Sequence, residues 1–181
     1  MEGFKRQAVI LSLVEKLIGA GNWCGETHIQ KAIYFLQEIF SVHLGFEFIL
    51  YKHGPYSFSL KDELANMKSY MFLESKPNYP YGPNLCPGET SDQLKHKYPR
   101  TINQYKKNID NIAKIMGKNK VVELERLATA LYVRRKNPKN DSVTSRAEIL
   151  TAHKPHVSIE DAETAIKKID EYLNKFTKTT V

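Results

Sequence analysis

The sequence predicts a mainly α-helical protein with a small antiparallel β-sheet. Apolar residues recur with a period close to 3.6 over most of the 181 residues, which is typical of amphipathic helices. One short apolar and β-prone segment, 46–51, ends at the breaker pair Gly54-Pro55. A stretch rich in Pro, Gly and Tyr, 78–92, is incompatible with a helix. These observations favour a winged-helix-like core over residues 1–92 and a helical part over residues 93–181 that packs on it in one compact domain.

The first two helices are predicted from their apolar faces. Residues 4–18 place Ile10, Leu13, Val14 and Leu17 on one side, and glycines and Asn22 follow as helix-ending residues. A second helix is expected from Thr27 to about residue 42, with an apolar stripe that begins at Ile29.

A strand, a rigid turn and a capped helix are predicted next. The segment 46–51 is expected to be a strand that the turn at residues 53–55 ends. Ser57 and Ser59 are both suitable N-caps, and Asp62 lies three residues after Ser59, so a third helix is expected to begin near Leu60.

The rest of the chain is predicted as one further strand and four helices. Residues 71–75 are expected to be a strand, and 78–92 a wing or hairpin that returns to the first strand. Helices are then expected over 102–116 and 124–131, over 145–152 with Ser145 as its cap, and after the cap Ser158.

The motifs of the first third resemble those of a known family. They are I-Q-K-A-I-Y-F-L-Q at 29–37, the aromatic strand, Y-K-H-G-P-Y-S at 51–57 and the leucine-bearing helix. In this order the segment Thr27–Leu64 is similar to the YwgA-like and Panacea-domain proteins of bacteria, archaea and phages. The resemblance implies a helix-rich, winged-helix-like domain without known enzyme activity. Panacea relatives act as antitoxins that bind and neutralise a toxin, which implies a protein partner.

The composition indicates a reduced, cytoplasmic protein. Only two cysteines occur, and a single pair gives no disulfide framework. The apolar run after Lys5 and Arg6 is interrupted by Glu15 and Lys16, which argues against a signal peptide. No apolar run approaches the roughly 20 residues that a membrane span needs, so no membrane partner is expected.

Positive charge is concentrated in one quarter of the chain. The net charge is +7, yet residues 93–139 hold 13 Lys and Arg against 3 Asp and Glu, a net +10. Such a block predicts a polyanion or an acidic protein partner, and the alternative is a solvated Lys-rich helical face. The candidate nucleic-acid-binding residues are Lys106, Lys107, Lys114, Arg126, Arg134, Arg135 and Lys136. Because the third helix is not basic, contact with the nucleic-acid backbone at low sequence specificity is expected.

Aromatic side chains around the turn and in the Pro-rich loop are candidates for a protein-binding surface. The residues are Tyr51, His53, Tyr56, Phe58, Tyr79 and Tyr81. Tyrosines of this kind can fill a partner's groove or stack on bases, and the alternative is that they pack on the protein's own core.

The sequence favours neither a metal site nor catalysis. Cys24, His28, Cys86 and His96 lack zinc-ribbon spacing. His53 could be a general base, but no nucleophile with an orienting acid can be assigned around it. The chain lacks a Walker loop, a dinucleotide fingerprint and an H-E-x-x-H helix, so no cofactor is expected.

Three functional hypotheses follow from the sequence. The first is a non-enzymatic regulatory module that associates with nucleic acid through residues 93–139. The second is an antitoxin-like protein that neutralises a toxin by direct contact, and the third and weakest is hydrolysis at His53. Homodimer formation stays open in each case.

Overall fold

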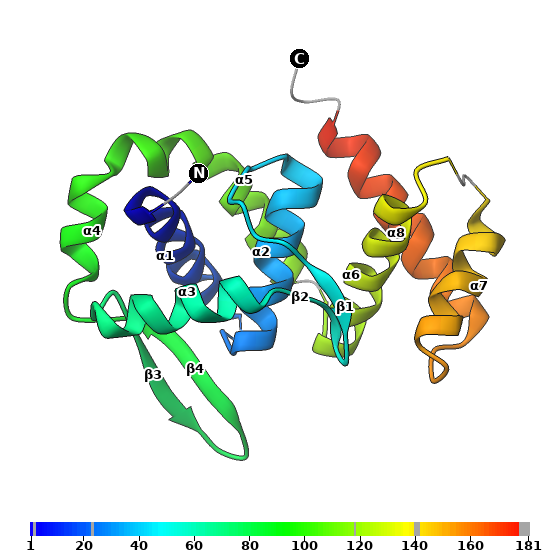
Figure 1. Cartoon of the computed structure of the whole chain (residues 1–181), viewed down its shortest axis with the longest axis horizontal. Helices are drawn as coiled ribbons and strands as arrows, with labels where there is room; N and C mark the ends of the chain where they lie inside the picture. Colours follow the sequence, from blue (N-terminus) through cyan, green and yellow to red (C-terminus); the bar gives the residue numbers. More distant parts are fainter. Residues whose placement is uncertain (2, 23, 118, 140–141, 178–181) are drawn as a thin grey trace.

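Eight helices and two β-hairpins make up the described part of the chain, which comprises residues 1, 3–22, 24–117, 119–139 and 142–177 of a computed structural model (Figure 1). The helices are α1 (Gly3–Gly19), α2 (Glu26–Phe40), α3 (Phe58–Ser69), α4 (Ser91–Lys97), α5 (Pro99–Gly117), α6 (Val121–Lys136), α7 (Val143–His153) and α8 (Ile159–Thr177). The strands are β1 (Ile49–Tyr51), β2 (Gly54–Tyr56), β3 (Leu73–Asn78) and β4 (Tyr81–Pro87). The predicted fold class, mainly α with a small antiparallel β component, is therefore confirmed.

Helix α2 lies at the centre of the molecule. It contacts α5 on one side and α6 and α8 on the other, and α1 packs along α5 (Figure 1). Most of its residues are buried, including the apolar stripe from Ile29 to Ile39. No helix in the described ranges is long and apolar enough to cross a bilayer.

Two helices begin earlier than the sequence predicted: α3 is capped by Ser57, the first of its two candidate caps, and α7 by Ser142 instead of the predicted Ser145. The Ser57 hydroxyl accepts a hydrogen bond from the Leu60 amide at 3.3 Å, so α3 begins at Phe58 rather than near Leu60. The Ser142 hydroxyl likewise accepts from the Ser145 amide at 3.2 Å and starts α7. The predicted cap of the last helix is confirmed, since Ser158 Oγ accepts from the Asp161 amide at 3.1 Å.

The hairpins correct the predicted strands. Only residues 49–51 of the predicted first strand form β1, which pairs antiparallel with β2 across a turn at Lys52 and His53. The predicted return of residues 78–92 to the first strand is wrong, because β4 pairs with β3 (Glu74 opposite Cys86). A tight turn at residues 79–80 places these two strands side by side, and adjacent strands pair at the lowest loop-closure cost. The winged-helix arrangement remains a prediction.

Helix α4 is not among the helices that the sequence predicts. It has seven residues and begins at Ser91, so the last two residues of the stretch 78–92, predicted to be non-helical, are helical; Leu94 is its only buried large apolar side chain. A single apolar residue gives no helical periodicity, so the pattern could not indicate this helix.

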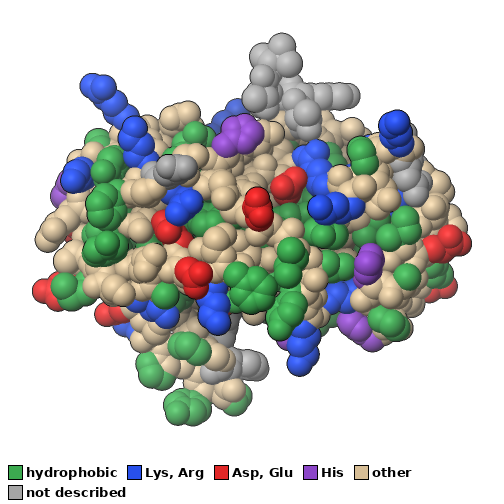
Figure 2. All heavy atoms as spheres, viewed as in Figure 1, with side chains coloured by type: hydrophobic (Ala, Val, Ile, Leu, Met, Phe, Trp, Pro, Cys, Tyr) green, Lys and Arg blue, Asp and Glu red, His purple; other side chains and the backbone are tan. Residues whose placement is uncertain are grey.

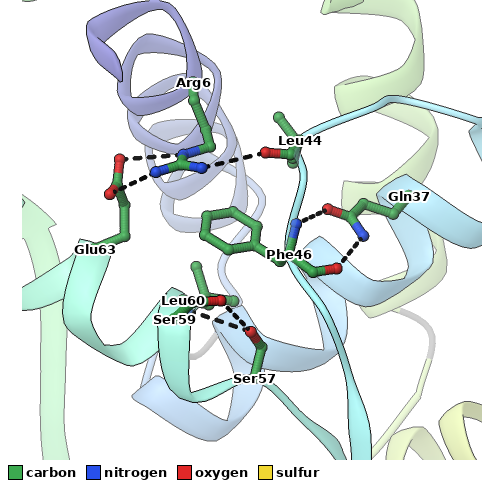
Figure 3. A network of polar contacts seen from close by, with 8 residues as sticks. All are labelled: Arg6, Gln37, Leu44, Phe46, Ser57, Ser59, Leu60 and Glu63. Atoms are coloured by element: carbon green, nitrogen blue, oxygen red, sulfur yellow. Dashed lines mark hydrogen bonds and ion pairs between the residues drawn. The ribbon is translucent and has the colours of Figure 1, made fainter. Parts of the chain in front are cut away.

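Polar side chains of α2 hold the segment before α3 in place. The Gln30 carboxamide donates to Ser57 O at 2.9 Å and accepts from Ser57 N at 2.9 Å. The Gln37 carboxamide makes the same pair of bonds with the backbone of Phe46, at 2.9 and 3.0 Å (Figure 3). Each glutamine thus satisfies one backbone N–H and one C=O that have no strand partner.

An ion pair joins α1 to α3 beside this segment. The Arg6 guanidinium contacts the Glu63 carboxylate through two nitrogens, at 3.2 and 2.8 Å, and donates to Leu44 O at 3.4 Å (Figure 3). Its carbon also lies 4.7 Å from the Phe46 ring centroid. A bidentate, stacked arginine fixes direction as well as distance, so it orients α3 on α1.

We expect Gln30→Ala to lower the free energy of unfolding by about 1–3 kcal/mol, because it leaves the buried N–H of Ser57 unsatisfied, while the Ser57 carbonyl still accepts from Lys61 N. The measurement is urea unfolding followed by circular dichroism. Gln104→Ala on the exposed face of α5 is the matched control, expected to change stability by less than about 0.5 kcal/mol. Similar losses in both variants would contradict a special role for the Gln30 pair.

Candidate functional site

Helix α5 presents a row of cations to solvent. Arg100, Lys107 and Lys114 are spaced by seven residues, so consecutive members lie on nearly the same face, about 10.5 Å apart along the axis. All three are exposed, and no described acidic residue forms an ion pair with any of them. Lysine and arginine side chains stand out at the upper left of Figure 2, over the course of α5 in Figure 1. We call these three residues the cationic row.

Other polar residues of α5 extend this surface. Asn103 and Gln104 are exposed on the same face, and Lys106 is exposed on its edge. Asp110, the acidic residue of α5, forms a 2.7 Å ion pair with Lys16 of α1. The face therefore carries cationic and amide side chains, and their N–H groups can donate hydrogen bonds to phosphate oxygens.

The candidate cations on α6 are placed differently. Three of them form ion pairs: Arg126 with Asp161 (2.8 Å), Arg134 with Asp170 (4.0 Å) and Arg135 with Glu38 (3.1 Å). Lys136 lies 5.5 Å from the ring centroid of Tyr132. Of the seven predicted residues, the structure thus leaves four exposed without a described acidic partner: Lys106, Lys107 and Lys114 on α5, and Lys136 at the end of α6.

Three of the predicted partner-binding residues form an exposed aromatic cluster. The ring centroids of Tyr51, Tyr56 and Phe58 are 5.2 to 5.9 Å apart. Tyr51 is 56% exposed and Phe58 53% exposed. The Tyr56 hydroxyl donates to Glu26 at 2.9 Å, and burial together with this bond raises the pKa of Tyr56 to about 12. We call these three residues the aromatic cluster.

The other three predicted residues lie apart from the aromatic cluster or outside the description. His53 turns toward α6, with Nδ1 3.2 Å from Glu125 Oε1. Tyr79 is 92% exposed at the tip of the β3–β4 hairpin, where Figure 2 shows hydrophobic side chains on the projection at the lower edge. The side chain of Tyr81 lies outside the described part of the chain.

Two lysines that were not predicted as site residues bind the backbone of the β1–β2 hairpin. The buried Lys31 Nζ donates to Pro55 O at 2.9 Å, and Lys154 Nζ donates to the carbonyls of Tyr51 and Lys52. Burial lowers the pKa of Lys31 to about 8. No local pattern marks such lysines, because their carbonyl partners lie 24 to 103 residues away.

The glycine of the H-G-P motif is required by both its conformation and its surroundings. Gly54 has φ +88, and a side-chain carbon there would lie 3.2 Å from Thr129 Oγ1 of α6. The hairpin can therefore lie flat on α6 only with glycine at this position.

An open cleft of about 730 Å³ lies beside the hairpin turn. Its wall combines the ends of α1 and α5, the first turns of α2 and α6, and the side chains of His28, His53 and Glu125. His28 is only 6% exposed, and no described residue hydrogen-bonds to its imidazole. Burial lowers the pKa of His28 to about 4, so the ring is neutral at physiological pH.

Thiols and metal ligands contribute no site within the described ranges. Cys24 is buried with Sγ 3.7 Å from Val14 O, and burial raises its pKa to about 12. Cys86 is a second free thiol, beside Glu74. Across the described residues, no group of three or more His, Cys, Asp or Glu is placed to hold a metal ion.

Comparison with known proteins adds no relative: no protein-family model matches the chain, and no curated protein matches it. The resemblance to YwgA-like and Panacea-domain proteins therefore stays a prediction. The polar residues of the helical motif have structural roles. Gln30, Lys31 and Gln37 each donate a hydrogen bond to a backbone carbonyl, those of Ser57, Pro55 and Phe46 respectively.

We expect His28 to make stability depend on pH between 6.5 and about 4. The unfolded chain binds a proton in this window and the folded chain does not, so stability is fully present above pH 6.5 and is lost as the pH falls. In His28→Leu this contribution is absent. The difference in unfolding free energy between wild type and variant should fall by at most about 3 kcal/mol from pH 7 to pH 4.

Urea unfolding at half-unit pH steps measures this difference. Because the carboxyl groups are the same in both proteins, their titration cancels in the comparison. A constant difference across the range would contradict the assignment of the acid sensitivity to His28.

Proposed function

We propose that this protein is a non-enzymatic module that associates with the nucleic-acid backbone through the exposed face of α5. The observation that carries the proposal is the cationic row, three exposed cations in line without a described acidic partner. Their spacing of about 10.5 Å is close to the axial rise of three base-pair steps, at about 3.4 Å each. A straight row of this kind can follow a phosphate backbone without reading bases.

The cations of α6 are weaker candidates for the same task. A phosphate that binds Arg126, Arg134 or Arg135 competes with a carboxylate already 2.8 to 4.0 Å away. The net gain in electrostatic free energy is then small, because one anion replaces another.

Low sequence specificity follows from the character of α3. On this helix Lys61 and Lys68 are interspersed with Asp62 and Glu63, and Glu63 is already bound to Arg6. A helix that reads the major groove carries cations and amides at its exposed positions. We therefore place the contact on α5 and on phosphates.

We expect a labelled random duplex or single strand to bind with a micromolar dissociation constant at low salt. The double variant Lys107→Glu, Lys114→Glu should weaken binding at least about tenfold and lower the log–log salt slope by about two. Fluorescence anisotropy across a salt series measures both quantities.

The matched control is Lys61→Glu, Lys68→Glu on α3, which changes the net charge by the same amount at two exposed positions. It should leave binding nearly unchanged. Equal losses in the two double variants would show that overall charge, rather than α5, governs the interaction, and absence of binding at low salt would overturn the proposal.

A second candidate function is an antitoxin-like role, with the aromatic cluster as the surface that grips a toxic protein. The supporting observation is the mutual ring packing of Tyr51, Tyr56 and Phe58 while two of the rings stay more than half exposed. Rigid, exposed aromatic side chains are typical of interface hot spots.

For this candidate we expect Phe58→Ser to abolish rescue of growth when the chain is co-expressed with a toxic protein encoded beside it in the genome. Val122→Ser is the matched control, because Val122 is an exposed apolar residue on α6 away from the aromatic cluster. Undiminished rescue by Phe58→Ser, with both variants folded by circular dichroism, would contradict the role of the cluster.

A further inference from the structure

The open cleft continues the line of the cationic row. Lys114, the last member of the row, lies one helical turn before Gly117, and Met116 and Gly117 form part of the cleft wall. A strand that follows the row toward the end of α5 therefore reaches the mouth of the cleft.

Two helix N-termini meet at the cleft without side-chain caps. The N-cap of α2 is Gly25 and that of α6 is Lys120, and neither side chain makes a capping hydrogen bond. The first turn of α2 reaches the wall at Thr27 and His28, and α6 reaches it at Val121. Open amide N–H groups and the positive ends of two helix dipoles favour an anion there.

One side chain, that of His28, points independently to a missing ligand. The buried His28 imidazole lines the cleft and has no hydrogen-bond partner among the described residues. A buried imidazole without a protein partner is uncommon in folded proteins, and an acceptor bound in the cleft would satisfy its N–H. The amino group of Lys120 adds a positive charge to the same wall.

The negative groups of the cleft are already engaged. Glu125 lies 3.2 Å from His53 Nδ1. At the end of α1 the carbonyl of Leu17 accepts from Asn22 N at 2.9 Å, and at the end of α5 the carbonyl of Ile115 accepts from Asn119 Nδ2 at 2.6 Å. These contacts engage one carbonyl at the end of α1 and one at the end of α5, while the first N–H groups of α2 and α6 have no side-chain cap.

We propose that the cleft binds the terminal phosphate group of a nucleic-acid strand that lies along α5. The phosphate monoester meets the first turns of α2 and α6, Lys120 and His28, and the terminal nucleoside packs on the exposed side chain of Val121. The inference rests on the proposed function, since the cationic row supplies the strand. It adds a preference for phosphorylated ends to an otherwise sequence-independent contact.

Matched oligonucleotides test the inference by anisotropy at one salt concentration. One pair of single strands is labelled at the 3′ end and carries a 5′-phosphate or a 5′-hydroxyl, and a second pair is labelled at the 5′ end and carries a 3′-phosphate or a 3′-hydroxyl. We expect a terminal phosphate to tighten binding about tenfold in at least one pair, as a few charge-assisted hydrogen bonds would.

Variants in the cleft should remove this preference alone. Lys120→Glu and His28→Leu are expected to bring phosphate- and hydroxyl-ended strands within about twofold of each other, whatever the change in affinity for the hydroxyl-ended strand. Lys139→Glu, an exposed cation outside the cleft, has the same charge change as Lys120→Glu and should keep the preference. Because Lys120 is exposed, its variant provides the test even if His28→Leu fails to fold.

The outcomes separate the two proposals. Binding without any preference for a terminal phosphate overturns the cleft inference and leaves the α5 proposal standing. A preference that survives Lys120→Glu also overturns it, because the phosphate then binds elsewhere. If no strand binds at low salt, the α5 proposal fails and the inference falls with it.

Discussion

Two pairs of glutamine–backbone hydrogen bonds hold the segment on which both candidate binding surfaces depend. Gln30 and Gln37 lie on the central helix and bind the backbone at Ser57 and Phe46, the two ends of the segment that contains the β1–β2 hairpin. Buried carboxamides of this kind bond at defined positions, so the segment is set in register on α2 in the way that a neighbouring strand would set it. The start of α3 and the position of the aromatic cluster follow from that register.

The hairpin in turn connects the two sides of the molecule. Its Gly54 lies flat against Thr129, its His53 contacts Glu125, and Lys154 binds its turn from the C-terminal helices. Through these contacts the same short turn presents aromatic side chains on one side and forms the wall of the cleft on the other. A single local structure therefore positions both candidate binding surfaces.

Tertiary structure gives the cations of the basic block different surroundings on different helices. The basic block 93–139 becomes an exposed row on α5 and a set of ion pairs on α6, with acids supplied from positions 38, 161 and 170. These acids lie outside the block, so composition alone gives all of its cations equal weight. Only the packing of α6 on α2 and α8 brings the carboxylates to the arginines.

The sequence by itself determined what depends on near neighbours: the helices with long apolar faces, the cap at Ser158, the turn at Gly54-Pro55 and the location of the basic block. It left Ser57 and Ser59 both open as the cap of α3, with the helix start about two residues late, and placed the cap of α7 three residues late, because neighbouring serines satisfy the same local rule. Tertiary structure alone decided the partner of β4, the short helix α4, the buried Lys31 and the cleft at the first turns of α2 and α6. Each of these depends on contacts between residues far apart in the chain, and hydrophobic periodicity carries no information about such contacts.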